Sequence, residues 1–126
     1  MSTPINTPDL QALYTQKLCS ADQAAKLIPK RCNISAAFFA GMPVSLFESV
    51  ARLAREKYYE HLDFYYMHST PHMAEHVLNI ETARILKPKP FYMGPAERAL
   101  VQQSLAIGEK LLEYMPGSFS QVPDLI

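Results

Sequence analysis

The chain has 126 residues, with 12 basic and 12 acidic side chains and a formal net charge of zero. Proteins that bind nucleic acids through phosphate contacts concentrate basic charge, so this balance argues against that class. Hydrophobic residues make up 48% of the chain and charged residues 19%, which is typical of a packed globular domain and excludes a disordered one. The length indicates one domain whose core needs no disulfide.

Cysteine content and the N-terminal composition both bear on the compartment. Cys19 and Cys32 are the two cysteines, too few for a disulfide framework or a zinc ribbon, so both are expected to be reduced thiols. Residues 1–10 lack the basic start and the apolar run of a secretory signal. No stretch approaches the roughly 18 apolar residues of a transmembrane helix. We therefore expect a cytoplasmic protein that does not enter a membrane.

The N-terminal part divides into a lead-in and the start of a folded domain. Residues 1–16 are polar and contain proline, which predicts an extended lead-in that lies over another surface. Residues 17–126 are expected to form the domain. Its first helix is marked by Ser20 and Gln23, which have the spacing of a capping box. This helix should end before Pro29, because the residue preceding a proline avoids the helical conformation.

A strand, a tight loop and a helix are expected next. Residues 32–40 form a short apolar run between turn residues, which predicts a strand buried on both faces. Residues 41–43 (Gly-Met-Pro) break this run. Ser45 and Glu48 have the spacing of a second capping box, and apolar residues then continue at helical spacing toward Tyr58.

The same order of elements repeats along the middle of the chain. Residues 62–67 are rich in aromatic side chains and predict a second strand. Thr70 and Pro71 supply a cap residue followed by proline at the first helical position. We expect the helix that they begin to run from Pro71 to about Ile80.

Proline separates these elements from the C-terminal ones. Residues 87–90 (Lys-Pro-Lys-Pro) predict a break, and residues 91–93 predict a short apolar strand. A helix should begin at residues 94–95 (Gly-Pro), with Glu97 in its first turn. Residues 111–115 predict one more strand, followed by a polar loop. The residues that this last helix is expected to bury are Leu100, Val101 and Leu105.

Strand and helix signals alternate, which predicts the α/β class with an open, mainly parallel sheet flanked by helices. Ligands of such sheets bind beyond the carboxyl ends of the strands, where the following helices begin. The loops expected to lie there are residues 39–43, 68–71, 93–95 and 117–121.

One short motif suggests a metal. Residues 72–76, His-Met-Ala-Glu-His, match the H-x-x-E-H arrangement of inverted zinc proteases. His72 and His76 share a helix face at this spacing and can reach one ion. A third ligand has to come from elsewhere in the chain, and Pro71 places His72 in the first turn. We therefore favour polar residues at a helix start or surface histidines, and predict no metal.

Other catalytic arrangements are weakly indicated. Cys32 stands at the start of an apolar strand, where a small buried side chain is expected instead of a nucleophile. Neither of the common glycine-rich phosphate-binding patterns occurs in the chain. The glutamates fit helix starts or solvated faces, and none is indicated as a nucleophile. These glutamates are Glu48, Glu75, Glu97 and Glu109.

Four segments, in order, resemble the amino-terminal part of the acetyl-CoA hydrolase/CoA-transferase family. The resemblance is strongest to its 4-hydroxybutyrate and itaconate CoA-transferases, and covers nearly everything from Tyr14 onward. The segments are YTQKLCSADQAAKLIPKRCNISAAFFAGMP, LDFYYMHST, KPFYMGPAERALV and YMPGSFSQVPDL.

The resemblance implies the N-terminal α/β domain of a CoA-transferase, in a chain normally several times longer. In this family a glutamate attacks the acyl-CoA thioester, and a glutamyl anhydride and a glutamyl-CoA thioester follow. That glutamate belongs to the second half of the family's proteins, so no catalytic residue is expected before Ile126. Coenzyme A is then a substrate and no cofactor is permanently bound. The expected partners are an acyl-CoA, a small carboxylic acid, and a second copy or a C-terminal half.

The resemblance also implies substrate-binding positions. The loop at residues 39–42 matches a glycine-rich loop that closes over the acyl group, although Gly41 is its one glycine. Two further loops match those that line the acyl and carboxylate pocket. Two alternatives stay open: an acyl-CoA hydrolase, and a non-enzymatic truncated or subunit-like interaction domain. The implied substrate-binding residues are Phe39, Ala40, Gly41, Met42, His68, Ser69, Thr70, Phe119, Ser120 and Gln121.

Overall fold

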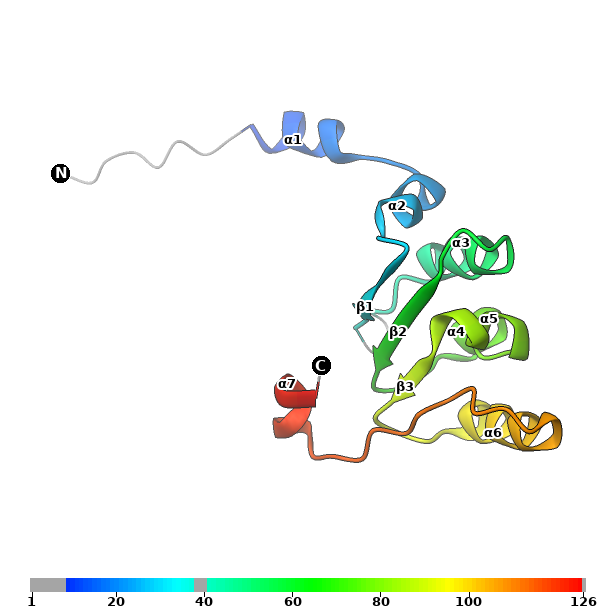
Figure 1. The fold of residues 1–126 in the computed structure, drawn as a ribbon. Helices are drawn as coiled ribbons and strands as arrows, with labels where there is room; N and C mark the ends of the chain where they lie inside the picture. The colour runs from blue at the N-terminus through cyan, green and yellow to red at the C-terminus, as the bar shows by residue number, and fades with distance from the viewer. Residues whose placement is uncertain (1–8, 38–40, 126) are drawn as a thin grey trace.

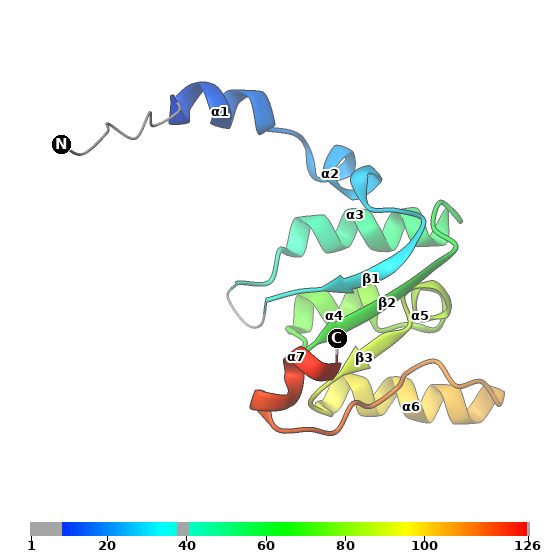
Figure 2. The same cartoon turned by 60° about the vertical axis from the view of Figure 1, so that its left-hand side comes forward.

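A computed structural model describes residues 9–37 and 41–125 of the chain. The helices and strands form a three-stranded parallel sheet with helices on it, which confirms the predicted α/β class (Figures 1 and 2). In chain order the elements are α1 (Leu10–Lys17), α2 (Ala21–Leu27), β1 (Arg31–Ser35), α3 (Val44–Arg55), β2 (His61–Tyr66), α4 (Pro71–Val77), α5 (Ile80–Leu86), β3 (Pro88–Pro90), α6 (Pro95–Ile107), the 3-10 turn η2 (Phe119–Gln121) and α7 (Val122–Leu125).

The strands lie in the order β1-β2-β3, so β2 is the central strand. Cys32 is paired with Leu62, and Phe64 with Pro88. Helices α3, α4, α5 and α6 lie together on one face of the sheet (Figure 1). Because the strands are parallel, their carboxyl ends share one edge, and α3, α4 and α6 begin beyond it (Figure 2).

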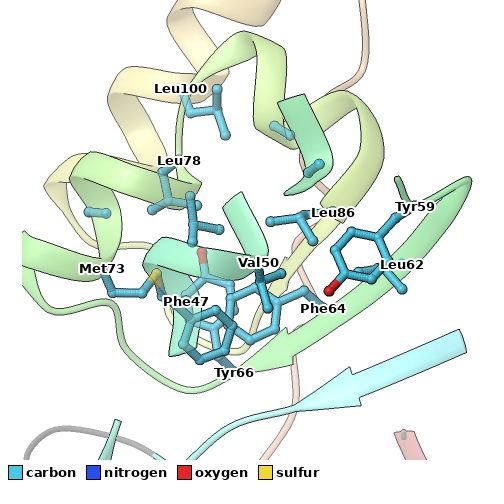
Figure 3. Close-up of a cluster of buried hydrophobic side chains, with 14 of the residues drawn as sticks. Phe47, Val50, Tyr59, Leu62, Phe64, Tyr66, Met73, Leu78, Leu86 and Leu100 are labelled. Atoms are coloured by element: carbon cyan, nitrogen blue, oxygen red, sulfur yellow. The ribbon is translucent and has the colours of Figure 1, made fainter. Parts of the chain in front are cut away.

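The hydrophobic core lies between the sheet and these helices. Leu62, Phe64 and Tyr66 alternate along β2 and point toward the helices, where they meet Phe47 and Met73 (Figure 3). The Phe47 and Phe64 rings are 4.8 Å apart, and Phe64 stacks on Tyr66 at 4.7 Å. The aromatic side chains of the predicted second strand therefore form the centre of the core.

Local signals correctly marked several helices. Ser20 and Gln23 form the predicted capping box of α2, and Thr70 caps α4 with Pro71 at its first position. The second predicted capping box is wrong: α3 begins at Val44, preceded by Pro43, without a side-chain cap from the described residues. Residues 10–17 form α1, which has no buried residue and lies apart from the sheet, where an extended lead-in was expected (Figures 1 and 2).

Two predicted segments differ from the structure. The first is in β1, because the described part of the chain places no helix layer on the sheet face opposite α3–α6 (Figure 1). β1 ends at Ser35, and residues 38–40 of the predicted strand lie outside the described part. Arg31, Asn33 and Ser35 are exposed while Cys32 and Ile34 are half-buried, so the expectation of a strand buried on both faces is wrong. In α6, Leu100 is buried as predicted, but Leu105 is 76% exposed and faces away from the core.

The third strand lies where a break was predicted. Pro88 and Pro90 are part of β3, and residues 91–93 follow it as a turn. Proline is tolerated at such an edge because it loses only its own N–H. Residues 111–115 run beside β3, and the Glu113 and Met115 amides donate to the Pro88 and Pro90 carbonyls at 3.0 Å. The prolines cannot donate in return, so the predicted strand at 111–115 does not form.

The predicted helix at 71–80 is shorter than expected, and a second helix that was not predicted follows it. α4 ends at Val77, and Asn79 caps α5 by accepting a hydrogen bond from the Thr82 amide at 3.0 Å. None of the helices in the described residues is long and apolar enough to cross a membrane.

Candidate functional site

A pocket of about 320 Å³ lies at the carboxyl ends of the strands. The chain after each strand contributes to it, and the C-terminal segment returns to close one side. We call this the strand-tip pocket. Its lining residues are Ser35, Ala36, Ala37, Tyr66, Met67, Phe91, Phe119 and Val122.

The fold explains why these residues meet. Ala36 continues the line of β1, since its amide donates to the Tyr65 carbonyl at 3.3 Å. Phe91 continues the line of β3 in the same way, donating to the Tyr66 carbonyl at 2.9 Å. The walls are therefore mostly methyl and aromatic groups on a hydrogen-bonded frame. Such walls suit a short apolar chain better than a charged group.

Volume alone does not single out the strand-tip pocket, because another hollow of similar volume occurs elsewhere in the fold. A hollow of about 310 Å³ lies between α6 and residues 108–112. It lies away from the carboxyl ends of the strands, where parallel sheets place their ligands. The strand-tip pocket is therefore the better candidate.

A buried carboxyl group lies behind the pocket wall. Glu97 is 1% exposed, and its Oε1 accepts a hydrogen bond from the Tyr66 hydroxyl at 3.1 Å. Its Oε2 has no hydrogen-bond partner among the described residues. A Cβ added at Gly94 would stand 2.7 Å from Oε2, so the glycine leaves room for the carboxyl group. Burial, and next the nearby Glu97, raise the pKa of Tyr66.

Sequence reasoning placed Glu97 in the first turn of a helix, which is confirmed, but a solvated side chain at this position is wrong because Glu97 is buried. Glu97 is the third residue of α6, after Gly94 and Pro95. The usable signal is the pattern Gly-Pro-x-Glu at the start of a helix, since a glutamate at this position turns back toward the start of its helix. Glu97 is hydrogen-bonded inside the protein, so it supports Tyr66 and does not face the pocket.

The loop after β1 was expected to bind the acyl group. Phe39 and Ala40 lie outside the described residues. Gly41 is exposed, and a Cβ there would approach the Ala37 Cβ to 3.0 Å. Met42 is 5% exposed and its side chain belongs to the core. Ala37, which precedes this loop, lines the pocket, and Met42 packs in the core.

The loop after β2 begins with His68. Its ring stacks on Tyr92 with the ring centres 4.5 Å apart, which joins the loops that follow β2 and β3. Ser69 and Thr70 are half-buried. The Thr70 hydroxyl accepts from the Met73 amide at 3.2 Å, so it is occupied as a helix cap. These residues lie at the predicted edge but do not line the strand-tip pocket.

The C-terminal loop reaches the same edge. Phe119 lines the pocket and is 68% exposed. Gln121 Oε1 accepts from the Ser118 amide at 2.8 Å, and the hydroxyls of Ser118 and Ser120 are 3.0 Å apart. The predicted polar groups of Ser120 and Gln121 therefore hold the turn that presents Phe119.

A second group of polar side chains lies between α3 and α4. His72 and His76 share one face of α4, as their spacing predicted. Glu48 Oε1 lies 2.9 Å from His72 Nε2 and 3.3 Å from His76 Nε2. We call these three residues the cross-helix cluster. Among the described residues, these three side chains are the group whose donor atoms lie close enough together to hold one metal ion.

The structure supports the prediction that Cys32 is a packed side chain. Cys32 packs against the core, and burial raises the pKa of its thiol, which disfavours the nucleophilic thiolate. Cys19 is exposed, and both cysteines are free thiols.

No protein-family model matches the chain, and no curated protein matches it. Several solved structures, in contrast, are similar to it. RipA from Yersinia pestis has 28% sequence identity and a TM-score of 0.88, over 94% of this chain and 28% of RipA. A RipA variant with a Phe-to-Met substitution has 29% identity and a TM-score of 0.87, over 94% of this chain and 27% of the variant. This chain is similar to about a quarter of RipA.

The likeness to RipA spans 94% of this chain. The larger part of RipA has no counterpart in these residues. The fold is thus one portion of a longer architecture in RipA.

Proposed function

We propose that this chain is the N-terminal domain of a CoA-transferase, which moves CoA between a short acyl-CoA and a carboxylic acid. One observation carries the proposal. The four segments that resemble the CoA-transferase family are far apart in sequence, yet each contributes residues to the strand-tip pocket. The resemblance thus includes the residues that line this pocket as well as those that build the sheet. The similarity to RipA supports a role within a longer protein.

The pocket is suited to the acyl part of the substrate. Ala36, Ala37 and Phe91 offer an apolar wall for a short chain. Polar groups on the loops at the same edge suit the carboxylate of the acceptor acid. The family resemblance implies that the loop at residues 39–42 supplies backbone N–H groups for the thioester oxygen. The polar side chains on these loops are Ser69, Thr70, Ser120 and Gln121.

The reaction needs a nucleophile from outside the described residues. A glutamate carboxylate attacks the thioester carbonyl, and CoA leaves as its thiolate. The thiolate then attacks the glutamyl carbonyl of the anhydride and releases the first acid, giving glutamyl-CoA. The acceptor carboxylate reverses these steps and carries CoA away. None of the described residues that line the pocket is a carboxylate, and Glu97 is buried and bound to Tyr66.

The nucleophile is therefore supplied by a C-terminal CoA-transferase half, and a second copy of this chain is a partner for association only. In this proposal the protein acts in the cytoplasm. Coenzyme A enters as a substrate, with no permanently bound cofactor and no catalytic metal.

The test measures CoA transfer from acetyl-CoA or butyryl-CoA to itaconate or butyrate. This chain alone should show no turnover, and the chain together with a C-terminal half should transfer CoA. Turnover by the chain alone would contradict the placement of the nucleophile. Thioester loss that is independent of the added acid would identify a hydrolase instead.

Filling the pocket tests its role within the active complex. Ala37→Trp should lower kcat/KM at least about 10-fold, since even one methylene in an apolar substrate pocket changes the rate by about that factor. Ala106→Trp, on the exposed side of α6, is the matched control and should leave the rate unchanged. Equal rates for Ala37→Trp and the unmodified protein would remove the pocket from the reaction.

A non-enzymatic interaction domain is the second candidate, and α1 favours it. Leu10, Tyr14 and Leu18 are all at least 60% exposed, and α1 lies apart from the sheet (Figure 1). Such a helix is suited to a partner surface. Complex formation without CoA transfer in any combination would support this alternative.

A further inference from the structure

The cross-helix cluster joins two helices that are separate in sequence. Glu48 lies in the second turn of α3, and His72 and His76 lie one turn apart on α4. We propose that these three side chains bind one divalent transition-metal ion of the zinc class. The proposal is independent of CoA transfer, because none of the three lines the strand-tip pocket.

The distances fit a common metal centre. Bonds of about 2.0–2.1 Å to a tetrahedral zinc place its ligand atoms about 3.3 Å from one another. Glu48 Oε1 is 2.9 Å from His72 Nε2 and 3.3 Å from His76 Nε2. All three donor atoms lie within 4.8 Å of one another. Small side-chain rotations therefore bring them to coordination distance, without movement of either helix.

The helices that hold the donors are fixed by the core. Phe47 and Val50 of α3 and Met73 of α4 are buried in the same cluster (Figure 3). Val77 of α4 belongs to it as well. The Thr70 cap fixes the start of α4 next to the first histidine. The metal would thus meet donors that are already near their final positions, which lowers the entropy cost of binding.

The donor set selects the kind of ion. Two imidazole nitrogens and one carboxylate oxygen suit zinc and its neighbours, whereas calcium and magnesium prefer oxygen ligands. Three protein ligands leave a fourth position for water, as in open zinc sites. The side chains of His72, Glu48 and His76 are 54%, 44% and 29% exposed. An ion can therefore enter from solvent.

The cluster differs from the H-x-x-E-H motif that the sequence suggested. Glu75, the glutamate within that motif, is exposed and lies outside the cluster. The third ligand is Glu48, which comes from the preceding helix. Spacing within α4 predicted that the two histidines meet, but only the packing of α3 on α4 brings the carboxylate to them.

The experiment measures zinc affinity for the untagged 126-residue chain after chelator treatment. Zinc is titrated against a chromophoric competitor, and cobalt(II) is used in parallel because its absorption reports the geometry. We expect one ion per chain and the intense visible bands of a tetrahedral centre. Glu48→Gln, His72→Asn and His76→Asn should each weaken zinc binding by more than about 100-fold, since loss of even an outer-shell partner costs about 10–100-fold.

Two controls make the result decisive. Glu75→Gln removes an exposed carboxylate from the same helix and should leave the affinity unchanged. Cys19→Ser tests the exposed thiol as a competing ligand and should also leave it unchanged. Absence of stoichiometric zinc binding, or equal affinity of Glu48→Gln and the unmodified chain, would overturn the proposal. Binding that is lost with Cys19→Ser and kept with Glu48→Gln would overturn it as well.

Thermal unfolding provides a second readout for the same variants. Zinc that binds the folded chain raises Tm by mass action. Saturating zinc should raise Tm for the unmodified chain and for Glu75→Gln, and leave it unchanged for Glu48→Gln. An equal rise in all three proteins would assign the zinc to another place and refute the cross-helix cluster as the site.

Discussion

The two faces of β2 are built from different chemistry. Leu62, Phe64 and Tyr66 point toward the helices and are at most 1% exposed. Side chains that alternate with them lie on the other face, which has no comparable helix layer in the described part of the chain (Figure 1). One strand thus carries both an apolar core surface and a polar surface. The residues of the polar surface are His61, Asp63 and Tyr65.

The polar face satisfies its charges within the sheet. Lys89 Nζ of β3 lies 3.1 Å from Asp63 Oδ1, and His61 Nε2 lies 3.2 Å from Asp63 Oδ2. Lys89 also lies over the Tyr65 ring, 5.2 Å from its centre. The comparison shows that packing stabilises one face and ion pairing the other. A substitution should therefore cost much more stability on the first face than on the second.

The largest expected effect tests the packed face. Phe64 is fully buried, so Phe64→Ala removes its contacts with Phe47 and Tyr66 and leaves a cavity. We expect the free energy of unfolding to fall by about 3–5 kcal/mol, measured by urea denaturation. Asn33→Ala, on the exposed side of β1, is the matched control and should change it by less than about 0.5 kcal/mol. Similar losses for the two variants would contradict the difference between the faces.

A smaller loss of stability is expected when the buried Glu97 carboxyl group loses its hydrogen bond. Tyr66→Phe removes the hydrogen bond to Glu97 and leaves the carboxyl group buried without it. The free energy of unfolding should fall by about 1–3 kcal/mol. Adding Glu97→Met should restore most of this loss, because the orphaned polar group is then absent as well. If the double variant is less stable than Tyr66→Phe, Glu97 has other favourable contacts that this reasoning omits.

Sequence patterns predicted the elements that depend on local chemistry. The Ser20 capping box, the Thr70-Pro71 helix start and the aromatic strand β2 all form as expected. Each is specified by residues a few positions apart. β3 was missed because proline normally marks a break. The backbone at its end is nevertheless held by β2, since the Phe91 amide donates to the Tyr66 carbonyl at 2.9 Å.

The candidate sites likewise combine features that local sequence patterns predict with features that depend on tertiary packing. The sequence predicted which loops lie at the carboxyl ends of the strands, since that follows from a parallel sheet. The resemblance implied Phe119 as a substrate-binding residue, but nothing in the sequence predicted that Ala36 and Phe91 would line the strand-tip pocket with it, or that Glu48 would meet His72 and His76. These contacts join segments whose separation in sequence carries no periodic signal. Only the packing of the helices and the return of the C-terminal loop determine them.

The smallest expected effect is a pH dependence of the polar face. Partial burial acts to raise the pKa of Asp63, but hydrogen bonds from Lys89 and His61 outweigh it, so the pKa lies below its ordinary value of 3.8. A carboxyl group with a lowered folded-state pKa stabilises the fold above its unfolded pKa. This stabilisation is lost as the pH falls through the folded value.

The measurement is Tm between about pH 6 and pH 2 for the unmodified chain, Asp63→Asn and Lys89→Met. The unmodified chain should lose more Tm below about pH 4 than Asp63→Asn, because the amide side chain of that variant takes up no proton in this range. Lys89→Met should also show a shallower loss, since it removes the cation that lowers the pKa of Asp63. Salt at about 1 M should reduce the differences by screening the pair. Parallel curves for all three proteins would show that the open face contributes no ion-pair stability.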